Sequence, residues 1–81
     1  MIIERLQPIF RDILDEPELA VTAALSPADC GQWDSVAQVR LVLALEEEFG
    51  IQFSTEDVAG FKTVGDFLSA LAKHGFQDSD A

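Results

Sequence analysis

The side chain best placed for chemistry in this sequence is that of Ser35, which follows Asp34 and opens a long helical pattern. A serine in the first turn of a helix lies beside backbone N–H groups without helical partners, at the positive end of the helix dipole. A phosphate ester on that hydroxyl would gain about 0.3–1 kcal/mol there. Asp and Ser are also common wherever helices begin. The dipeptide alone therefore leaves open whether this is a modification site or an ordinary helix start.

An intrinsic enzyme is hard to assemble from the other residues. The single histidine, His74, is expected at the surface near the end of the last helix, where a cation complements the dipole. Cys30 has no basic neighbour in the sequence to activate its thiol, which favours a small buried side chain. Asp34 has no histidine to work with and is better placed to cap the helix or to position a modifying enzyme's metal. A hydrolase that uses Ser35 as nucleophile is therefore disfavoured.

Composition predicts one small soluble domain. The chain has 81 residues, 48% of them hydrophobic, with six Phe and one Trp, which is enough for a core. Its longest uncharged apolar run, Leu41 to Leu45, is far shorter than the roughly 20 residues of a membrane span. The first ten residues contain Glu4 and Arg5 and so do not look like a signal peptide. A cytoplasmic protein is the expectation.

Net charge limits the classes of partner. Fifteen acidic side chains against five basic ones give a formal charge of −10. Nucleic acids and anionic membranes would be repelled, since binding to them depends on Lys and Arg. Proteins with basic patches would instead be met quickly and in a salt-dependent way.

The first part of the chain predicts one helix and one long loop. Apolar residues recur at spacings of three and four over residues 1–15, where Pro8 is expected to cause a kink or to move the first turn to near Gln7. Residues 17–33 show no sustained period and predict an irregular segment. The residues expected to hold it against the core are Val21, Leu25 and Trp33.

Residues 35–49 form the strongest helical pattern. Asp34 is a suitable N-cap, and Gly50 stands where a left-handed C′ residue belongs. The apolar residues expected on the core side are Val39, Leu41, Val42, Leu45 and Phe49. A separate face, expected to contact partner proteins, combines Val36, Arg40, Leu43 and Glu47.

Two further helices complete the predicted fold. Ser54-x-x-Asp57 caps a short helix that ends before Gly60, and Thr63-x-x-Asp66 caps the last one. The buried residues expected on the last helix are Val64, Phe67, Leu68 and Leu71, with Gly75 at its end. The predicted fold is all-α: a small bundle of three longer helices and one short one, with a long loop between the first two. Residues 1–76 form the domain, and residues 77–81 form a polar tail.

The longer string around Ser35 resembles the prosthetic-group region of acyl and peptidyl carrier proteins. In that family an Asp-Ser-(Leu or similar) motif opens the second helix, and here it reads Asp34-Ser35-Val36. Residues 45–51, LEEEFGI, look like the end of that helix, and residues 61–67, FKTVGDF, are similar to the segment entering the last one. The likeness extends from residue 25 to residue 71.

The resemblance implies a four-helix bundle of acyl-carrier type in which Ser35 carries 4′-phosphopantetheine. A phosphopantetheinyl transferase would attach it from coenzyme A, with Asp34 beside the site. The arm would hold an acyl or aminoacyl cargo as a thioester and keep it near partner enzymes at raised effective concentration. The implied protein is a monomeric carrier and not an enzyme. An acyl or aminoacyl ligase would load it, and downstream acyl-using enzymes would act on its cargo.

The sequence departs from the fatty-acid-synthesis version of the family. Those carriers usually have acidic residues on the early exposed face of the second helix, and here those positions hold Ala37 and Arg40. The acidity is displaced to residues 46–48, which fan around the helix and are expected to be solvated. With Trp33 before the motif, the chain looks more like a stand-alone carrier of a specialised pathway. The alternative is a small acidic helical adaptor that binds basic partners without a prosthetic group.

Overall fold

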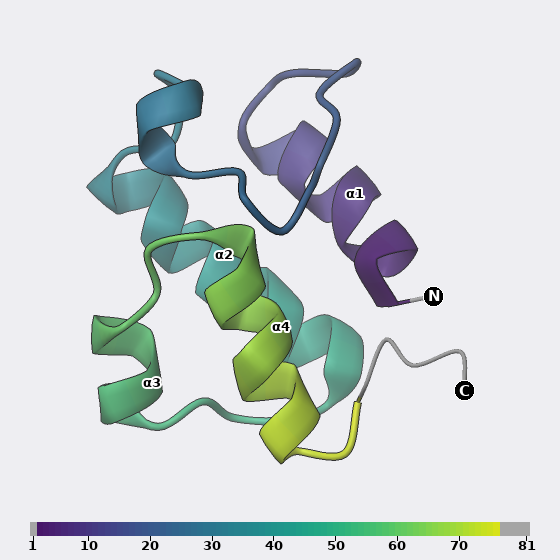
Figure 1. The fold of residues 1–81 in the computed structure, drawn as a ribbon, viewed down its shortest axis with the longest axis vertical. Coiled ribbons are helices and arrows are strands. Elements are labelled where there is room, and N and C mark those ends of the chain that lie inside the picture. The colour runs from purple at the N-terminus through teal and green to yellow at the C-terminus, as the bar shows by residue number, and fades with distance from the viewer. Residues whose placement is uncertain (1, 77–81) are drawn as a thin grey trace.

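Four α-helices make up most of residues 2–76, the part of the chain that the computed structural model describes. The elements are α1 (Ile2–Ile13), α2 (Ser35–Phe49), α3 (Thr55–Ala59) and α4 (Val64–Lys73), with a short 3₁₀ helix, η1 (Pro27–Asp29), before α2 (Figure 1). The predicted all-α class, with one short helix and a long loop between the first two, is confirmed. The tail expected at residues 77–81 lies outside the described residues.

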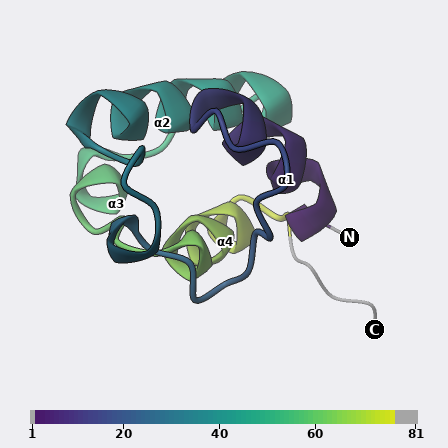
Figure 2. The same cartoon turned by 90° about the horizontal axis from the view of Figure 1, so that it is seen from above.

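The helices surround a shared interior. Seen from above, α2 lies between α1 and α3, α4 lies across from α2, and the long α1–α2 loop crosses the end of the bundle (Figure 2). This arrangement places the start of α2 next to the loop and close to the α3–α4 segment (Figure 1). Ser35 is therefore supported by parts of the chain that are distant in sequence.

Helix α1 begins earlier than the sequence suggested. It starts at Ile2 and continues through Pro8, so of the two outcomes expected at Pro8 the first turn near Gln7 is wrong, and the kink stays a prediction. Proline removes one backbone donor from a helix. Burial of Ile2 and Leu6 in the core holds the turns before Pro8 in place and offsets that loss.

The loop between α1 and α2 is packed against the core. The predicted anchors Val21, Leu25 and Trp33 are all buried, and so is Cys30. The carbonyls of Leu25 and Ala23 accept hydrogen bonds from the N–H groups of Val64 (3.0 Å) and Gly65 (2.8 Å) at the start of α4. A Cβ on Gly65 would lie 3.1 Å from the Ala23 carbonyl oxygen, so glycine allows this close approach.

An aromatic cluster around Phe67 joins these elements. The Phe67 ring lies 5.7 Å from Phe10 of α1, 4.2 Å from Phe61 and 6.4 Å from Trp33, measured between centroids. Phe10 also meets Trp33 edge-on at 5.5 Å. Each favourable aromatic pair contributes about 0.5–1.5 kcal/mol beyond its buried area. The cluster therefore ties α1, α4 and the segment before α2 together.

The buried side of α2 differs from the predicted one at two positions. Its buried residues are Ala37, Leu41, Val42, Leu45 and Phe49. Val39, expected beside the core, is 58% exposed, and Ala37, expected on the exposed face, is 5% exposed. At 3.6 residues per turn, Ala37 lies only about 40° around the helix from Leu41, whereas Val39 lies about 160° away. The smaller residue therefore faces the core.

The helix caps follow the sequence signatures. Ser54 Oγ accepts a hydrogen bond from the Asp57 N–H at 3.0 Å, and Thr63 Oγ1 accepts one from the Asp66 N–H at 3.3 Å. Asp66 Oδ2 in turn accepts from the N–H groups of Lys62 (2.8 Å) and Thr63 (2.9 Å). The α4 buried side comprises Val64, Phe67, Ala70 and Leu71, while the expected Leu68 is only half-buried.

The end of α4 also forms as expected. His74 is the exposed C-cap residue, and Gly75 follows it with φ of 94°. The N–H of Phe76 reaches back to the Leu71 carbonyl at 2.9 Å, a bond typical of a glycine-terminated helix.

Asp66 should make the fold sensitive to acid. The N–H groups of Lys62 and then Thr63 lower the pKa of Asp66 below its ordinary value of 3.8. A depressed folded-state pKa contributes stability that is present above the unfolded pKa and is lost as pH falls through the folded one. We therefore expect Asp66→Asn to lose stability at pH 7 and to lose less at pH 3, where the contribution of the ionised carboxylate has begun to disappear. Urea unfolding at both pH values checks this, with the exposed Asp12→Asn as control; an equal Asp66→Asn deficit at both would contradict it.

Candidate functional site

The junction singled out by the sequence lies where the long loop meets α2. Asp34 is extended, with φ of −107°, and its Oδ1 accepts a hydrogen bond from the Ala37 N–H at 2.9 Å. Ser35 is the first residue of the helix and is exposed. At the other end, Gly50 takes the left-handed conformation with φ of 66°. The predicted N-cap, C-cap and boundaries of α2 are confirmed.

The donors beside Ser35 remain open. Asp34 accepts a hydrogen bond from the Ala37 N–H, whereas the N–H groups of Ser35 and Val36 have no hydrogen-bond acceptor within residues 2–76. The Ser35 hydroxyl makes no hydrogen bond within the same part of the chain. A phosphate ester on this hydroxyl would lie beside backbone donors and the positive end of the α2 dipole. The local chemistry fits the prosthetic group that the resemblance implies.

An open groove begins at Ser35. Its volume is about 450 Å³, and its lining residues are Pro27, Trp33, Asp34, Ser35, Gln38, Val58 and Phe61. Apolar surface from η1, α3 and the α3–α4 segment is combined there with the Gln38 amide and the Asp34 carboxylate. This mixed lining suits a flexible chain that contains both methylene and amide groups, as pantetheine does.

A hydrogen-bonded chain holds the floor of this groove. Trp33 Nε1 donates to Gln38 Oε1 at 2.7 Å, and Gln38 Nε2 donates to the Phe61 carbonyl at 3.4 Å. Trp33 is buried, so its N–H needs such an acceptor. The contacts connect the loop before α2, the first turn of α2 and the segment before α4. They fix the position of Ser35 relative to the core.

The Asp34 cap is expected to contribute to stability. We expect Asp34→Ala to lower the free energy of unfolding by about 1 kcal/mol, because the Ala37 N–H loses its acceptor. Asp34→Asn should keep most of that stability, since asparagine caps helices about as well. Urea unfolding of the two variants separates capping from charge. A large loss in both would show that the carboxylate charge, and not the cap, is what stabilises the junction.

The outward side of α2 carries the four residues predicted to contact partners. Val36, Arg40, Leu43 and Glu47 are all exposed, and Val36 and Leu43 are 68% and 59% exposed. Val39 joins them and was missed because its apolar character favoured a core position. We refer to Val36, Val39, Arg40, Leu43 and Glu47 as the α2 face. Its contact with partner proteins remains a prediction.

The glutamates at the end of α2 have separate roles. Glu46 Oε2 accepts the Phe53 N–H at 2.8 Å, and Glu48 binds Arg5 at 3.1 Å. The Arg5 guanidinium also lies 4.2 Å from the centre of the Phe49 ring. Glu46 is therefore half-buried and bonded to the segment after α2, which the expectation of a solvated face missed, whereas Glu48 is exposed as expected and pairs with Arg5 at the surface. They fan around the helix as predicted.

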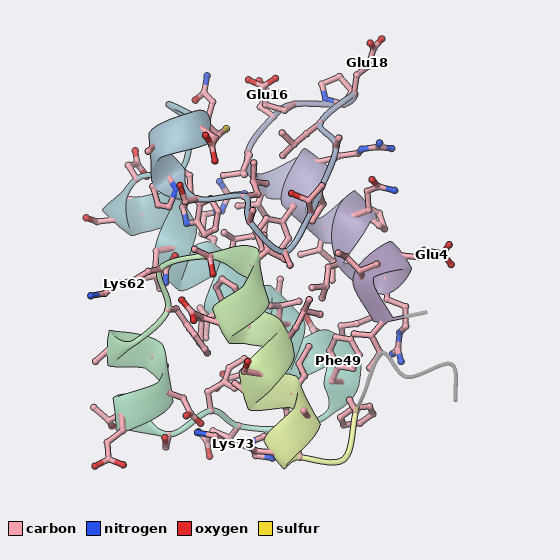
Figure 3. The ribbon with its side chains drawn as sticks, viewed as in Figure 1. Glu4, Glu16, Glu18, Phe49, Lys62 and Lys73 are labelled. Atoms are coloured by element: carbon pink, nitrogen blue, oxygen red, sulfur yellow. The ribbon has the colours of Figure 1, made fainter. Side chains whose placement is uncertain are left out.

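Other acidic residues lie away from the α2 face. Glu4, Glu16 and Glu18 project outward from α1 and the loop that follows it (Figure 3).

Within residues 2–76, no group of three or more His, Cys, Asp or Glu side chains is arranged to hold a metal ion. None of the helices in that part of the chain has the length and apolar composition needed to cross a membrane.

Comparisons with known proteins agree with this site. A family pattern described as "Phosphopantetheine attachment site" matches residues 4–71. An acyl carrier protein from Clostridium perfringens is 37% identical over 71 residues, covering 88% of this chain and 93% of the relative. One from Thermosynechococcus vestitus is 40% identical over 71 residues, covering 86% of each chain.

Solved structures show the same fold. A structure from Mycobacterium tuberculosis, assigned as an acyl carrier protein, superposes with a TM-score of 0.81 at 30% identity, covering 91% of this chain and 99% of the other. A holo acyl carrier protein from Geobacter metallireducens gives 0.80 at 31% identity, covering 88% and 82%. The resemblance carried by residues 34–36 and the segments after them is confirmed. The chain belongs to the acyl carrier proteins, which bear a phosphopantetheine group and interact with phosphopantetheinyl transferases and acyl-using enzymes; they are carriers and not enzymes.

Proposed function

We propose that Ser35 is the attachment point of phosphopantetheine. The observation that carries this assignment is an exposed hydroxyl at the start of α2, beside open N–H groups and the groove. Two other serines of the described chain are used locally: Ser26 Oγ bonds Asp29 at 3.4 Å, and Ser54 caps α3. Ser69 lies within α4, where the N–H groups are already bonded along the helix. Among the serines within residues 2–76, Ser35 is the one whose hydroxyl and surroundings are both available.

The chemistry at Ser35 is a phosphoryl transfer performed by a phosphopantetheinyl transferase. The Ser35 hydroxyl gives up its proton, forms a phosphodiester bond, and displaces adenosine 3′,5′-bisphosphate from coenzyme A. When bound, the group supplies a thiol that holds an acyl or aminoacyl cargo as a thioester. The open N–H groups of Ser35 and Val36 would stabilise the charge of the phosphodiester, and the groove would offer a surface for the arm. The packed core keeps the attachment point in one position.

We also propose that this carrier acts in a specialised pathway and not in general fatty-acid synthesis. In this proposal a ligase loads the cargo, and the carrier is a monomer in the cytoplasm. Support comes from α2, which has no acidic residue between Ser35 and Leu45 and exposes Arg40 on its outward side. Ala37 contributes nothing to this argument because it is buried. An adaptor without a prosthetic group loses support, because the family carries phosphopantetheine.

Loading in vitro tests the attachment proposal. The apo protein is incubated with coenzyme A, Mg²⁺ and a broad-specificity phosphopantetheinyl transferase, and its intact mass is recorded. We expect an increase equal to one phosphopantetheine, and fragmentation should place it within residues 31–40. An unchanged mass, or a modification mapped to another serine, would overturn the assignment.

A further inference from the structure

The large hydrophobic side chains that are exposed within residues 2–76 gather on one helix. The large hydrophobic residues that are exposed within residues 2–76 are Val36, Val39 and Leu43. All three belong to the α2 face, and the first of them directly follows Ser35. Scattered single apolar residues are normal on a protein surface, but three on one side of a 15-residue helix form a continuous strip.

Arg40 stands within this strip without a hydrogen-bond or ion-pair partner among residues 2–76. Arg5 pairs with Glu48, Arg11 donates to the Leu19 carbonyl at 2.8 Å, and Lys73 pairs with Asp57 at 3.0 Å. The Arg40 guanidinium makes no such contact within residues 2–76. An arginine that remains unpaired on a chain of net charge −10 is not needed for internal stability.

The three glutamates of α2 do not form an ion pair with Arg40. Glu46 and Glu48 are occupied by the Phe53 N–H and by Arg5. Glu47 is exposed but lies seven residues from Arg40, about 10 Å along the helix axis. The part of the α2 face next to Ser35 is therefore apolar with one positive charge.

We propose that the α2 face docks on an enzyme whose surface presents an apolar patch with an Asp or Glu carboxylate facing Arg40. This inference rests on the proposed function, since the docked enzyme acts on the cargo carried at Ser35. Covering Arg40 with apolar surface alone would leave a desolvated charge unpaired, which is strongly unfavourable. A carboxylate removes that penalty, and the surrounding Val36, Val39 and Leu43 exclude water from the pair.

Other occupants of this surface fit less well. A two-fold contact between copies, centred on the strip from Val36 to Leu43, would bring Arg40 close to its own symmetry mate, and like charges repel. Anionic lipids and nucleic acids are repelled by the net charge of −10. The strip is also small for a stable interface, which suits a carrier that must release each enzyme after the reaction.

Cross-linking from the arm tests the partner chemistry. Ser35 is loaded with a pantetheine analogue that carries an electrophile, and the product is exposed to extract of the source organism. Wild type, Arg40→Gln and Arg40→Glu are compared with Lys62→Glu, a matched charge reversal at an exposed residue between α3 and α4 (Figure 3). Captured enzymes are identified by mass, and kcat/KM is measured for each with the four carriers in the holo form. Thermal unfolding checks that all four are equally folded.

The outcomes separate this proposal from the attachment proposal. We expect Arg40→Gln to lower kcat/KM about tenfold, Arg40→Glu to lower it further, and Lys62→Glu to have little effect. A Lys substituted for the facing carboxylate of the enzyme should restore activity with Arg40→Glu. Equal capture and kinetics for all carriers, no capture by wild type, or a gain with Arg40→Glu would overturn the docking proposal. Failure of wild type to load at Ser35 would overturn the attachment proposal instead.

Discussion

Replacing Ser35 with alanine should abolish the attachment of phosphopantetheine while leaving the fold intact. The hydroxyl is the only atom of this residue that can form the phosphodiester, and it makes no hydrogen bond within residues 2–76. Alanine is well tolerated in helices, and Asp34 still caps α2, so stability should change by less than about 0.5 kcal/mol. Intact mass after incubation with coenzyme A and the transferase, together with a thermal unfolding curve, measures both effects.

Ser54→Ala is the matched control for this experiment. Ser54 also stands at the start of a helix, but its Oγ caps α3 by accepting the Asp57 N–H. Its removal should lower stability by about 1 kcal/mol and leave loading complete. Loading of Ser35→Ala, or loss of loading in Ser54→Ala without unfolding, would show that the assignment of the site is wrong.

The largest effect on stability is expected from Phe67→Ala. Phe67 is fully buried and contacts the rings of Phe10, Trp33 and Phe61. Removing such a ring costs about 3–5 kcal/mol, because apolar contacts are lost and a cavity remains. Domains of this size have about 4–12 kcal/mol in total. We therefore expect Phe67→Ala to remove a large share of the free energy of unfolding, seen as a large drop in the urea concentration at the midpoint of unfolding followed by circular dichroism.

Val39→Ala is the comparison that tests burial as the cause. Val39 was expected near the core from sequence, but it is exposed. Its truncation should change the free energy of unfolding by less than about 0.5 kcal/mol. A loss comparable to that of Phe67→Ala would mean that α2 packs in the orientation first predicted from the sequence, with Val39 inside.

Features that depend on neighbouring residues could be predicted from the sequence. The ends of α2 follow from Asp34 and Gly50, and the starts of α3 and α4 follow from Ser54 and Thr63. Capping works through side chains that bond N–H groups two or three residues away, so its signature is local. Gly50 is preferred because a left-handed backbone has little penalty without a Cβ.

Features that depend on distant contacts could not be predicted in this way. α2 is apolar on more than one side, so periodicity did not decide whether Ala37 or Val39 faces the core. The start of α1 at Ile2 depends on burial in the assembled bundle, and Glu48 depends on Arg5, which is 43 residues away. None of these partners is visible in the local sequence.

The candidate site combines both kinds of information. Ser35 could be selected because residues 45–51 and 61–67 match the carrier family at the right spacing, whereas Asp34-Ser35 alone describes many helix starts. The groove could not be predicted, since η1, α2, α3 and the α3–α4 segment meet there only in the folded chain. The spacing alone predicted that Arg40 and Glu47 lie on the outward side of α2. That Arg40 has no partner within residues 2–76 could be seen only in the folded chain, where Arg5 and Arg11 bind other groups.

The mass of the protein purified from its native host tests the central claim most directly. If Ser35 carries the arm in the cell, the intact mass should exceed that of the unmodified chain by one phosphopantetheine, alone or with a cargo attached. Fragmentation should place the addition on Ser35, and hydroxylamine should release any cargo held as a thioester. An unmodified chain from cells that contain an active transferase, or an addition on any other residue, would contradict the account.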